Sequence, residues 1–425
     1  MKTNRGLLLL SCTFVQLAVA GAWPESSENH PFFVKGVTFT INNTPEDPYR
    51  QRKALQEVKA IGANAIRTWG VGKETGDLLD NAQQEGLKVV VGLWLEHGRN
   101  GAEGDGSLNY AKDEERKLRQ KENLLRDVAR YKDHPALLGW GVGNEVILNI
   151  ASEDQKVAYA KYLEEVVQEI KKLDPDHPVI SVSAWTVSVP YWEKYTPGLD
   201  AYGINSYGPA AGAIPDALKA QDADKMYLVT EFGPRGAWDS PKDEFGVPQM
   251  PSDDEKYDQI SRGWSEWIEG NRARGCAGGF VFNFGDDDAP TSIWLDFYVR
   301  GLRRPAYWAT HKAFSGKDPG VPLENFDGLM VSPKTVQPGG VVKVGIEPLT
   351  GEDLTDVNFT FSPEFGGRDN RNRMLPVEST GIKGRIFQLQ VPAEPGIYRI
   401  YASKKSVGGN VTITQSSVKI EAAAE

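Results

Sequence analysis

Two glutamates in this chain each close a short apolar segment that contains glycine. Glu145 ends the segment Leu138–Glu145, and Glu231 lies near the end of Tyr227–Gly233. A protonated carboxyl group can donate a proton to a leaving atom, and an ionised one can attack a carbon atom. The pair therefore has the residue types for acid and nucleophile chemistry. A solvated loop position, or pairing with a buried arginine, is the alternative interpretation of either glutamate alone.

The elements that must position these glutamates are short apolar runs alternating with helical stretches. Such runs, apolar on both sides, are typical of parallel strands covered by helices. They span Phe33–Phe39, Ala65–Trp69, Lys88–Leu95, Leu137–Val142, Pro178–Trp185, Ala201–Tyr207, Met226–Phe232 and Gly278–Phe284. Helical spacing of apolar residues marks Tyr49–Ile61, Thr75–Gln84, Asp113–Tyr131, Asp154–Leu173, Asp253–Arg272 and Pro305–Phe314. The pattern predicts a (β/α)₈ TIM barrel over residues 32–316. A doubly wound open sheet is the alternative.

In such a barrel the active site lies at the carboxyl ends of the strands. Glu145 closes the fourth strand and Glu231 the seventh, so their carboxylates can face each other across a central cleft. Glycoside hydrolysis needs this arrangement, because one carboxyl group protonates the leaving oxygen while the other attacks the anomeric carbon. A gap of about 5–5.5 Å predicts retention and about 6.5–9.5 Å predicts inversion. A cationic neighbour such as Arg67 would keep the nucleophile ionised.

The segment Arg130–Glu145 resembles the strand-four region of the clan A retaining glycoside hydrolases, in particular the catalytic domains of families 2 and 5. Its Asn-Glu pair is the specific part. The resemblance implies that Glu145 is the acid/base and that Asn144 bonds the sugar 2-OH. The segment Val229–Gly233 resembles the nucleophile segment of the same group, which makes Glu231 the nucleophile.

Two more segments are similar to this group. Asn64–Arg67 resembles its second strand, which implies that Arg67 lies beside the nucleophile. Ala201–Tyr207 resembles its sixth strand, which implies that Tyr207 supports the nucleophile. Asn205 in the same segment is a candidate substrate contact.

Strand eight departs from the pattern of the group, which presents a tryptophan there as a platform for the sugar. Phe282-Asn283-Phe284 stands in its place, so either Trp294 replaces the platform or the sugar is held differently. Further candidate substrate contacts follow strands two, three and five: Trp69, Trp94, Trp185, Glu96 and His97. Packing at the barrel rim is the alternative for the tryptophans. We interpret Asp286–Asp288 as a solvated acidic loop, with sugar or calcium binding as the alternative.

Composition excludes several classes of partner. The net charge of −10 and the absence of a basic cluster argue against nucleic acid. The five histidines show no metal-binding spacing. We therefore expect a carbohydrate substrate, no cofactor and no metal, and the oligomeric state is left open.

The N-terminus has the layout of a secretory signal peptide. Lys2 and Arg5 precede the apolar run Leu7–Val19, and small residues end the segment at Ala20. The run is shorter than the roughly 20 residues of a membrane span. We expect residues 1–20 to be removed and the protein to be extracellular or periplasmic, with a lipoprotein signal at Cys12 as the alternative. Only the second cysteine of the chain would then remain, so no intramolecular disulfide is expected.

Helical periodicity ends near Lys317–Gly320. Alternating runs separated by Pro and Gly turns follow at Val341–Ile346, Val357–Phe361, Ile386–Val391, Tyr398–Ser403 and Val411–Val418. They predict a small antiparallel, immunoglobulin-like β-sandwich over residues 322–421. We expect it to pack on the barrel, with carbohydrate binding as the alternative.

These observations together predict a retaining hydrolase of β-linked poly- or oligosaccharides, with β-glucan favoured. A transglycosylase that uses the same covalent intermediate is one alternative. A carbohydrate-binding barrel without catalysis is the other.

Overall fold

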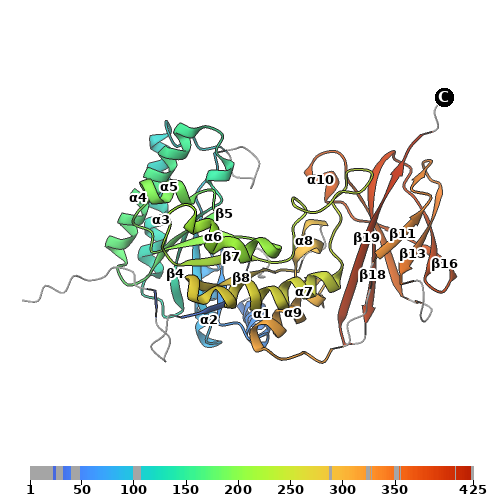
Figure 1. Ribbon diagram of the computed structural model, residues 1–425, viewed down its shortest axis with the longest axis horizontal. Helices are drawn as coiled ribbons and strands as arrows, with labels where there is room; N and C mark the ends of the chain where they lie inside the picture. Colours follow the sequence, from blue (N-terminus) through green and yellow to red (C-terminus); the bar gives the residue numbers. More distant parts are fainter. Residues whose placement is uncertain are drawn as a thin grey trace, which may run out of the picture.

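The first part of the chain folds into a closed barrel of eight parallel strands, as predicted (Figure 1). The computed structural model describes residues 23–24, 32–39, 48–98, 107–286, 290–321, 326, 328–348, 354, 356–406 and 408–422. The barrel strands are β1 (Val34–Phe39), β2 (Ala65–Arg67), β3 (Lys88–Leu93), β4 (Leu137–Asn144), β5 (Val179–Ala184), β6 (Ala201–Asn205), β7 (Tyr227–Phe232) and β8 (Cys276–Phe284). The expected signal peptide lies outside the described residues.

Helices connect successive strands and surround the barrel. They are α1 (Pro48–Ala60), α2 (Thr75–Gln84), α3 (Glu114–Tyr131), α4 (Glu153–Leu173), α5 (Val189–Tyr195), α6 (Ile214–Lys219), α7 (Asp253–Gly263), α8 (Pro290–Leu295) and α9 (Pro305–Ser315). The sequence pattern did not indicate α5, α6 and α8, because helices of 7, 6 and 6 residues span too few turns to show a period. The helix expected over 253–272 ends at Gly263 and continues as a π-turn over Trp264–Ile268 and a 3₁₀ segment over Glu269–Arg274.

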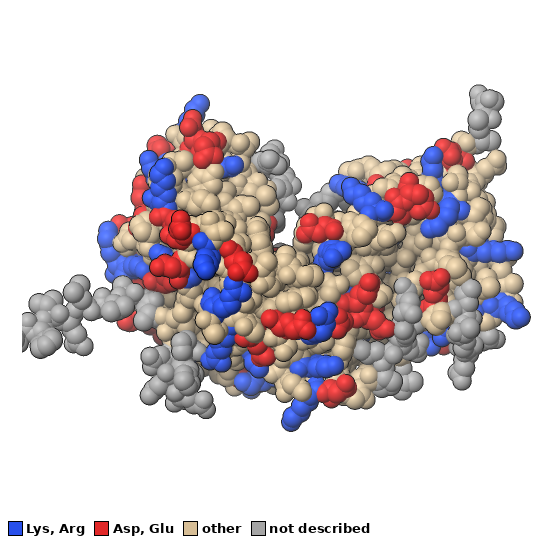
Figure 2. Space-filling view, in the orientation of Figure 1, with Lys and Arg blue, Asp and Glu red and all other residues tan. Residues whose placement is uncertain are grey.

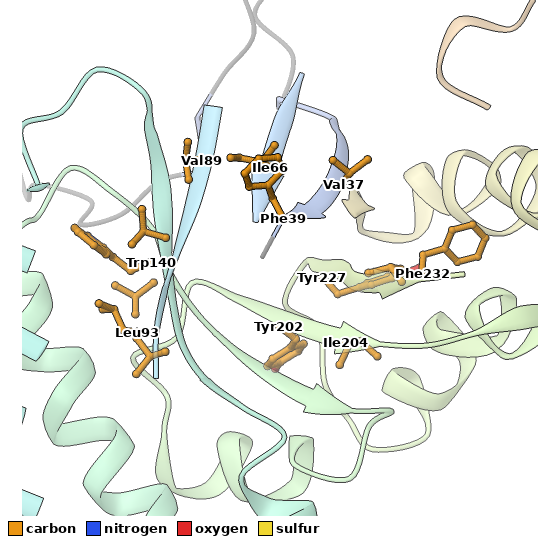
Figure 3. Close-up of a cluster of buried hydrophobic side chains, with 14 of the residues drawn as sticks. Val37, Phe39, Ile66, Val89, Leu93, Trp140, Tyr202, Ile204, Tyr227 and Phe232 are labelled. Carbon is orange, nitrogen blue, oxygen red and sulfur yellow. The ribbon is translucent and has the colours of Figure 1, made fainter. Parts of the chain in front are cut away.

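The barrel strands bury side chains on both faces. One cluster packs inside the barrel and takes at least one residue from every strand: Val34, Ala65, Val90, Leu138, Ile180, Ala201, Leu228, Ala277 and Phe280. Neighbouring residues point the other way and pack against the helices; Figure 3 shows Val37, Ile66, Val89, Trp140, Tyr202 and Phe232 among them. This burial on both sides explains why the strands are continuous apolar runs.

Closure of the barrel depends on a glycine at the seam between β8 and β1. Gly278 pairs with Val34, and its φ of +103° lies in a region that favours glycine. A Cβ atom at this position would lie 2.1 Å from the carbonyl oxygen of Val34. The two strands can therefore approach to hydrogen-bonding distance only with glycine there.

The C-terminal part consists of antiparallel sheets, as predicted. The strands are β11 (Gly328–Ser332), β12 (Thr335–Val336), β13 (Val341–Glu347), β14 (Val357–Pro363), β15 (Leu375–Val377), β16 (Ser379–Lys383), β17 (Ile386–Gln390), β18 (Gly396–Ser406) and β19 (Asn410–Ile420). One sheet has the order β11-β13-β17-β16. The other contains β15-β14-β18-β19, and a shared core that includes Val344, Phe361 and Tyr398 fills the space between them.

The barrel part contributes two strands to this second sheet. After β8, the chain forms β9 (Tyr298–Val299) and β10 (Leu302–Arg303), and β10 pairs with β19. In Figure 1, β18 and β19 lie between α7 and α8 on one side and the sheet of β11 and β13 on the other. A small apolar cluster, Ile293, Val299, Tyr401, Val411 and Ile413, fills the junction. The second sheet thus packs on the barrel.

A buried ion pair also crosses this junction. The Nη2 atom of Arg304 lies 2.6 Å from the Oδ1 atom of Asp253, and both residues are almost fully buried. The Oδ2 atom of the same carboxylate accepts a 2.9 Å hydrogen bond from the backbone N–H of Ile413 in β19. Asp253, at the start of α7, therefore links this helix to Arg304 and to the C-terminal sheet.

On the face seen in Figure 2, the surface is hollowed between the part that carries α4 and α5 and the part that carries α8. Acidic and basic side chains are interspersed over this face and form no basic patch. Cys276 is a free, buried thiol, and burial raises its pKa to about 11.

Among the described residues, no helix has the length and apolar character that a bilayer crossing requires.

Candidate active site

The carboxyl ends of β2, β4, β6 and β7 bring together a set of buried polar side chains. Arg67 ends β2 and Glu231 lies in β7, and their Nη1 and Oε1 atoms are 3.1 Å apart. The other guanidinium nitrogen, Nη2, donates a 2.8 Å hydrogen bond to Oδ1 of Asn144 at the end of β4. The planar fork of an arginine can hold two acceptors in fixed directions. Arg67 therefore aligns the ends of β4 and β7.

Glu231 accepts hydrogen bonds from three side chains. Its Oε1 atom accepts from Arg67 and, at 3.0 Å, from the indole Nε1 of Trp69. Its Oε2 atom accepts from the hydroxyl of Tyr207 at 2.7 Å. Donors directed at both oxygens hold the carboxylate in one orientation, and one of these donors is a cation. The arrangement suits a carboxylate that acts as a nucleophile.

Tyr207 is kept in its protonated, donating form. Burial and the neighbouring negative charge of Glu231 raise the pKa of its phenol well above the usual value, and the charge of Glu145 adds to the shift. The pKa of the phenol therefore depends on the charges of both glutamates. A phenol in this setting donates to Glu231 and does not act as a base at neutral pH.

Glu145 lies in a different environment. It is only half-buried, and its Oε1 atom accepts a 2.8 Å hydrogen bond from the neutral amide Nδ2 of Asn205. Asn205 is oriented by Thr230, whose hydroxyl donates to the amide oxygen Oδ1 at 2.8 Å. The same Nδ2 group lies 3.3 Å from Oδ1 of Asn144. Glu145 and Glu231 are therefore joined through Asn205, Asn144 and Arg67.

The backbone at Glu145 adopts an unusual conformation. Its φ angle is +54°, a left-handed region that non-glycine residues seldom adopt. Gly143, two residues earlier, also has a positive φ of +71°, and a Cβ atom there would lie 2.9 Å from the hydroxyl of Tyr159. Such strain is typical of functional positions whose surroundings hold the chain in place. Here it turns the Glu145 side chain at the end of β4.

His97 supports the site through a contact with the backbone of Asn144. It is fully buried, and its Nε2 atom lies 2.8 Å from the carbonyl oxygen of Asn144. A carbonyl oxygen only accepts, so Nε2 carries the proton. The ring of Trp94 packs on His97 with centroids 5.0 Å apart. Trp94 also lines a separate hollow of about 380 Å³ together with Glu96, which is paired with Arg116.

Phe282, in β8, packs against two residues that donate hydrogen bonds to Glu231. Its ring is edge-on to Trp69 and to Tyr207, with centroids 5.8 and 5.9 Å apart. Trp294 lies elsewhere: it is 4% exposed, and its indole nitrogen donates to the carbonyl oxygen of Arg235. Trp294 is thus buried beneath the loop that follows β7 and presents no face to a sugar. The sequence marked the departure at strand eight, but not which aromatic residue fills the site.

Trp238 was not among the residues singled out from the sequence. It lies in the loop after β7, its side chain is 63% exposed, and its ring is edge-on to Tyr207 at a centroid distance of 5.0 Å. Trp185, after β5, has a φ of +49° and donates its backbone N–H to the carbonyl oxygen of Asn205. Exposure cannot be read from a sequence, so no signal distinguished Trp238 from the other ten tryptophans.

No group of three or more potential metal ligands occurs within the described part of the chain. Asp286 accepts the backbone N–H of Gly301, while Asp287 and Asp288 lie outside the described residues.

Residues 48–209 match the model of the TIM-barrel domain of glycosyl hydrolases family 2. The matched stretch runs from the start of α1 to the residues just beyond β6 and includes the segment of Glu145. A curated relative, the β-glucuronidase of Pongo abelii, is 31% identical over 160 residues, which make up 36% of this chain and 21% of that protein. The chain therefore spans about a fifth of the length of that relative.

Two solved structures share the fold. An FMN-binding β-glucuronidase from Facaelibacterium prausnitzii L2-6 has a TM-score of 0.50 and 14% identity, covering 96% of this chain and 58% of that chain. An endo-1,4-β-mannanase from Rhizomucor miehei also has a TM-score of 0.50 and 14% identity, covering 70% of this chain and 99% of that chain. At these identities the likeness extends to the fold alone.

Proposed function

We propose that this chain is a retaining β-glycoside hydrolase in which Glu231 is the nucleophile and Glu145 the acid/base. The observation that carries the proposal is the contrast between the two carboxylates. Glu231 receives three donors, one of them the cation Arg67. Glu145 receives a neutral amide donor and is half-buried. Two carboxyl groups in contrasting environments can divide the acid and nucleophile roles between them.

The chemistry follows from these two environments. In the first step a carboxylate oxygen of Glu231 bonds to the anomeric carbon as the glycosidic C–O bond breaks, and Glu145 gives its proton to the leaving oxygen. In the second step Glu145 takes a proton from water, whose oxygen attacks the same carbon and releases Glu231. Two displacements on one carbon retain its configuration. Tyr207 and Arg67 hold the attacking carboxylate during both steps.

Asn144 and Asn205 complete the proposed site. The Oδ1 atom of Asn144 is occupied by Arg67 and Asn205, so its Nδ2 group is the part that can donate to a sugar hydroxyl. This is consistent with a contact to the 2-OH, which strengthens in the transition state. We propose β-glucans first among β-linked substrates. β-Glucuronides and β-mannans belong in the same panel, because the similar proteins act on them by name.

The test is a panel of 4-nitrophenyl β-glycosides and β-linked oligosaccharides, with the product anomer followed by NMR. We expect the wild type to release the β-anomer first and Glu231→Gln to lose turnover. Glu145→Gln should slow substrates with poor leaving groups by about 10²–10⁴-fold. Added azide should restore cleavage of an activated glycoside in Glu145→Ala and give a β-glycosyl azide.

Glu169→Gln, on the exposed side of α4, is the matched control and should keep full activity. Initial release of the α-anomer, or full activity in Glu231→Gln, would contradict the proposal. Product analysis at high substrate concentration separates hydrolysis from transfer to a second sugar. A wild-type protein that binds oligosaccharides without cleaving any would favour the non-catalytic alternative.

We also propose that the protein is exported, because residues 1–20 have the layout of a signal peptide. N-terminal sequencing of the mature protein should begin shortly after Ala20. A mature protein that begins at Cys12 would show lipoprotein processing instead.

A further inference from the structure

Three large apolar side chains are exposed on loops that follow barrel strands. Leu148 follows β4 and is 50% exposed, Val187 follows β5 and is 42% exposed, and Trp238 follows β7 and is 63% exposed. Single exposed apolar residues need no explanation. These three share the carboxyl ends of strands, however, which is the rim where a barrel binds its substrate.

Buried, hydrogen-bonded neighbours hold the segments that carry Leu148 and Val187 in place. Leu148 lies between Ile147 and Asn149, which are buried, and the side chain of Asn149 donates to the carbonyl oxygen of Glu145 at 3.1 Å. The turn that exposes Leu148 is therefore fixed to the proposed acid/base.

Val187 lies between two buried residues as well. Ser188 exchanges hydrogen bonds with the side chain of Ser183, and Thr186 accepts one from Gln221. A side chain held outward by buried neighbours loses little conformational entropy when a ligand covers it.

Trp238 is also fixed in place. A Cβ atom on Gly236 would lie 2.3 Å from its ring, so the indole rests directly on the glycine backbone. Its edge contact with Tyr207 fixes the other side. A large aromatic surface is thus held ready beside the residue that supports Glu231.

The different roles of Glu231 and Glu145 place these loops on the leaving-group side of the substrate. The sugar that bonds to Glu231 must lie against the side chains around that carboxylate, among them Trp69 from the end of β2, on which Phe282 from β8 packs. The departing group must lie beside Glu145, because Glu145 gives it a proton. The loops after β4, β5 and β7 belong to the half of the barrel that runs from Glu145 to Glu231.

We propose that Leu148, Val187 and Trp238 form a subsite for the leaving-group side of the substrate, and that its occupant is a further sugar unit of an uncharged chain. The inference rests on the proposed hydrolase function. All three side chains are uncharged and offer apolar surface, which matches the C–H-rich face of a pyranose ring. The enzyme then cleaves bonds between sugars of a chain in preference to small glycosides.

The test compares two substrates of the sugar that the panel identifies: its β-linked tetrasaccharide and its β-glycosyl fluoride. The fluoride places nothing in the proposed subsite. We expect Trp238→Ala to lower kcat/KM for the tetrasaccharide about tenfold more than for the fluoride, mainly through KM, since one stacking contact contributes on this scale. Val187→Ser should shift the same ratio by a smaller factor.

Leu173→Ala is the matched control, because Leu173 is 39% exposed at the end of α4 and lies near the start of β5, away from the carboxyl ends of the strands. It should leave the ratio of the two substrates unchanged. An equal fall for both substrates in Trp238→Ala, or no fall for either, would overturn the subsite. A wild type that cleaves no glycoside of the panel would overturn the proposed function itself, and the subsite with it.

Discussion

Arg67 and Glu231 form a buried ion pair with a nitrogen–oxygen distance of 3.1 Å, although 164 positions separate them in the sequence. The contact exists because β2 and β7 end at the same edge of the barrel. Arg67 also reaches Asn144, the residue before the proposed acid/base. One guanidinium group thus sets the relative position of both glutamates.

Replacing Arg67 by lysine tests whether the site needs two directed hydrogen bonds from one guanidinium group. Lysine keeps the charge but carries a single ammonium group, which cannot hold Glu231 and Asn144 in the same directions. Loss of one charge-assisted hydrogen bond corresponds to about 1.5–3 kcal/mol, or roughly 10–100-fold in kcat/KM. Steady-state kinetics measure this effect, and unchanged kinetics in Arg67→Lys would show that the ion pair alone is sufficient.

Tyr207→Phe removes the donor to Oε2 of Glu231 while it keeps the ring. We expect kcat/KM to fall by roughly 10–100-fold, because a hydrogen bond to a charged group is lost. Circular dichroism should show an unchanged fold. A fall seen only in KM would indicate that Tyr207 binds substrate and does not position the nucleophile.

The pH dependence of stability follows from the raised pKa of Tyr207. The unfolded phenol ionises near pH 10, whereas the folded one stays protonated at higher pH. Its contribution is therefore fully present below pH 10 and is lost as the pH rises above that value. Denaturant unfolding between pH 8 and 11 should show a steeper decline for the wild type than for Tyr207→Phe. Parallel curves for the two proteins would contradict this origin of the decline.

Asn205 donates to both Glu145 and Asn144. Asn205→Asp places a second carboxylate beside Glu145, and like charges favour protonation. We expect the alkaline limb of the pH–rate profile to move to higher pH, with Asn205→Ala as the control that removes the donor without adding charge. An alkaline limb at the same pH in all three proteins would indicate that Glu145 does not govern it.

The junction between barrel and C-terminal sheet contains a buried lysine, Lys256. Its Nζ atom makes no hydrogen bond within the described residues but lies 3.8 Å from Oδ1 of Asp253. Burial and the nearby Arg304 lower its pKa well below the usual value. We expect Lys256→Met to raise the free energy of unfolding by about 1–3 kcal/mol.

Asp253→Ala should lower the same free energy by about 3–5 kcal/mol, because it leaves Arg304 buried without its partner. Chemical denaturation measures both effects. A destabilised Lys256→Met protein would show that the contact between Lys256 and Asp253 outweighs the cost of burying the amine.

Much of the architecture could be predicted because it depends on local pattern. Strands buried on both faces appear as apolar runs, and the rule that barrel sites lie at strand ends selected Glu145 and Glu231 from many acidic residues. Arg67 and Tyr207 followed from the similarity of their segments to those of known barrels.

Other features depend on contacts between distant segments. Phe282 lies beside Trp69 and Tyr207, whereas Trp294 is buried, and neither fact follows from the spacing of aromatic residues. Trp69 looked like a sugar platform, but its indole nitrogen donates to Glu231. The end of α7 at Gly263 is likewise a matter of packing, because a Cβ atom there would lie 2.5 Å from the ring of Trp267.

The strand pairing between β10 and β19 has a consequence for the modular use of this protein. A gene fragment that stops at the end of the barrel would leave β10 as an unpaired edge and would expose Ile293 and Val299 to water. Such a fragment should aggregate when it is expressed alone. The two parts would therefore be inherited and exchanged as one unit, and neither would serve as an independent building block in a fusion protein.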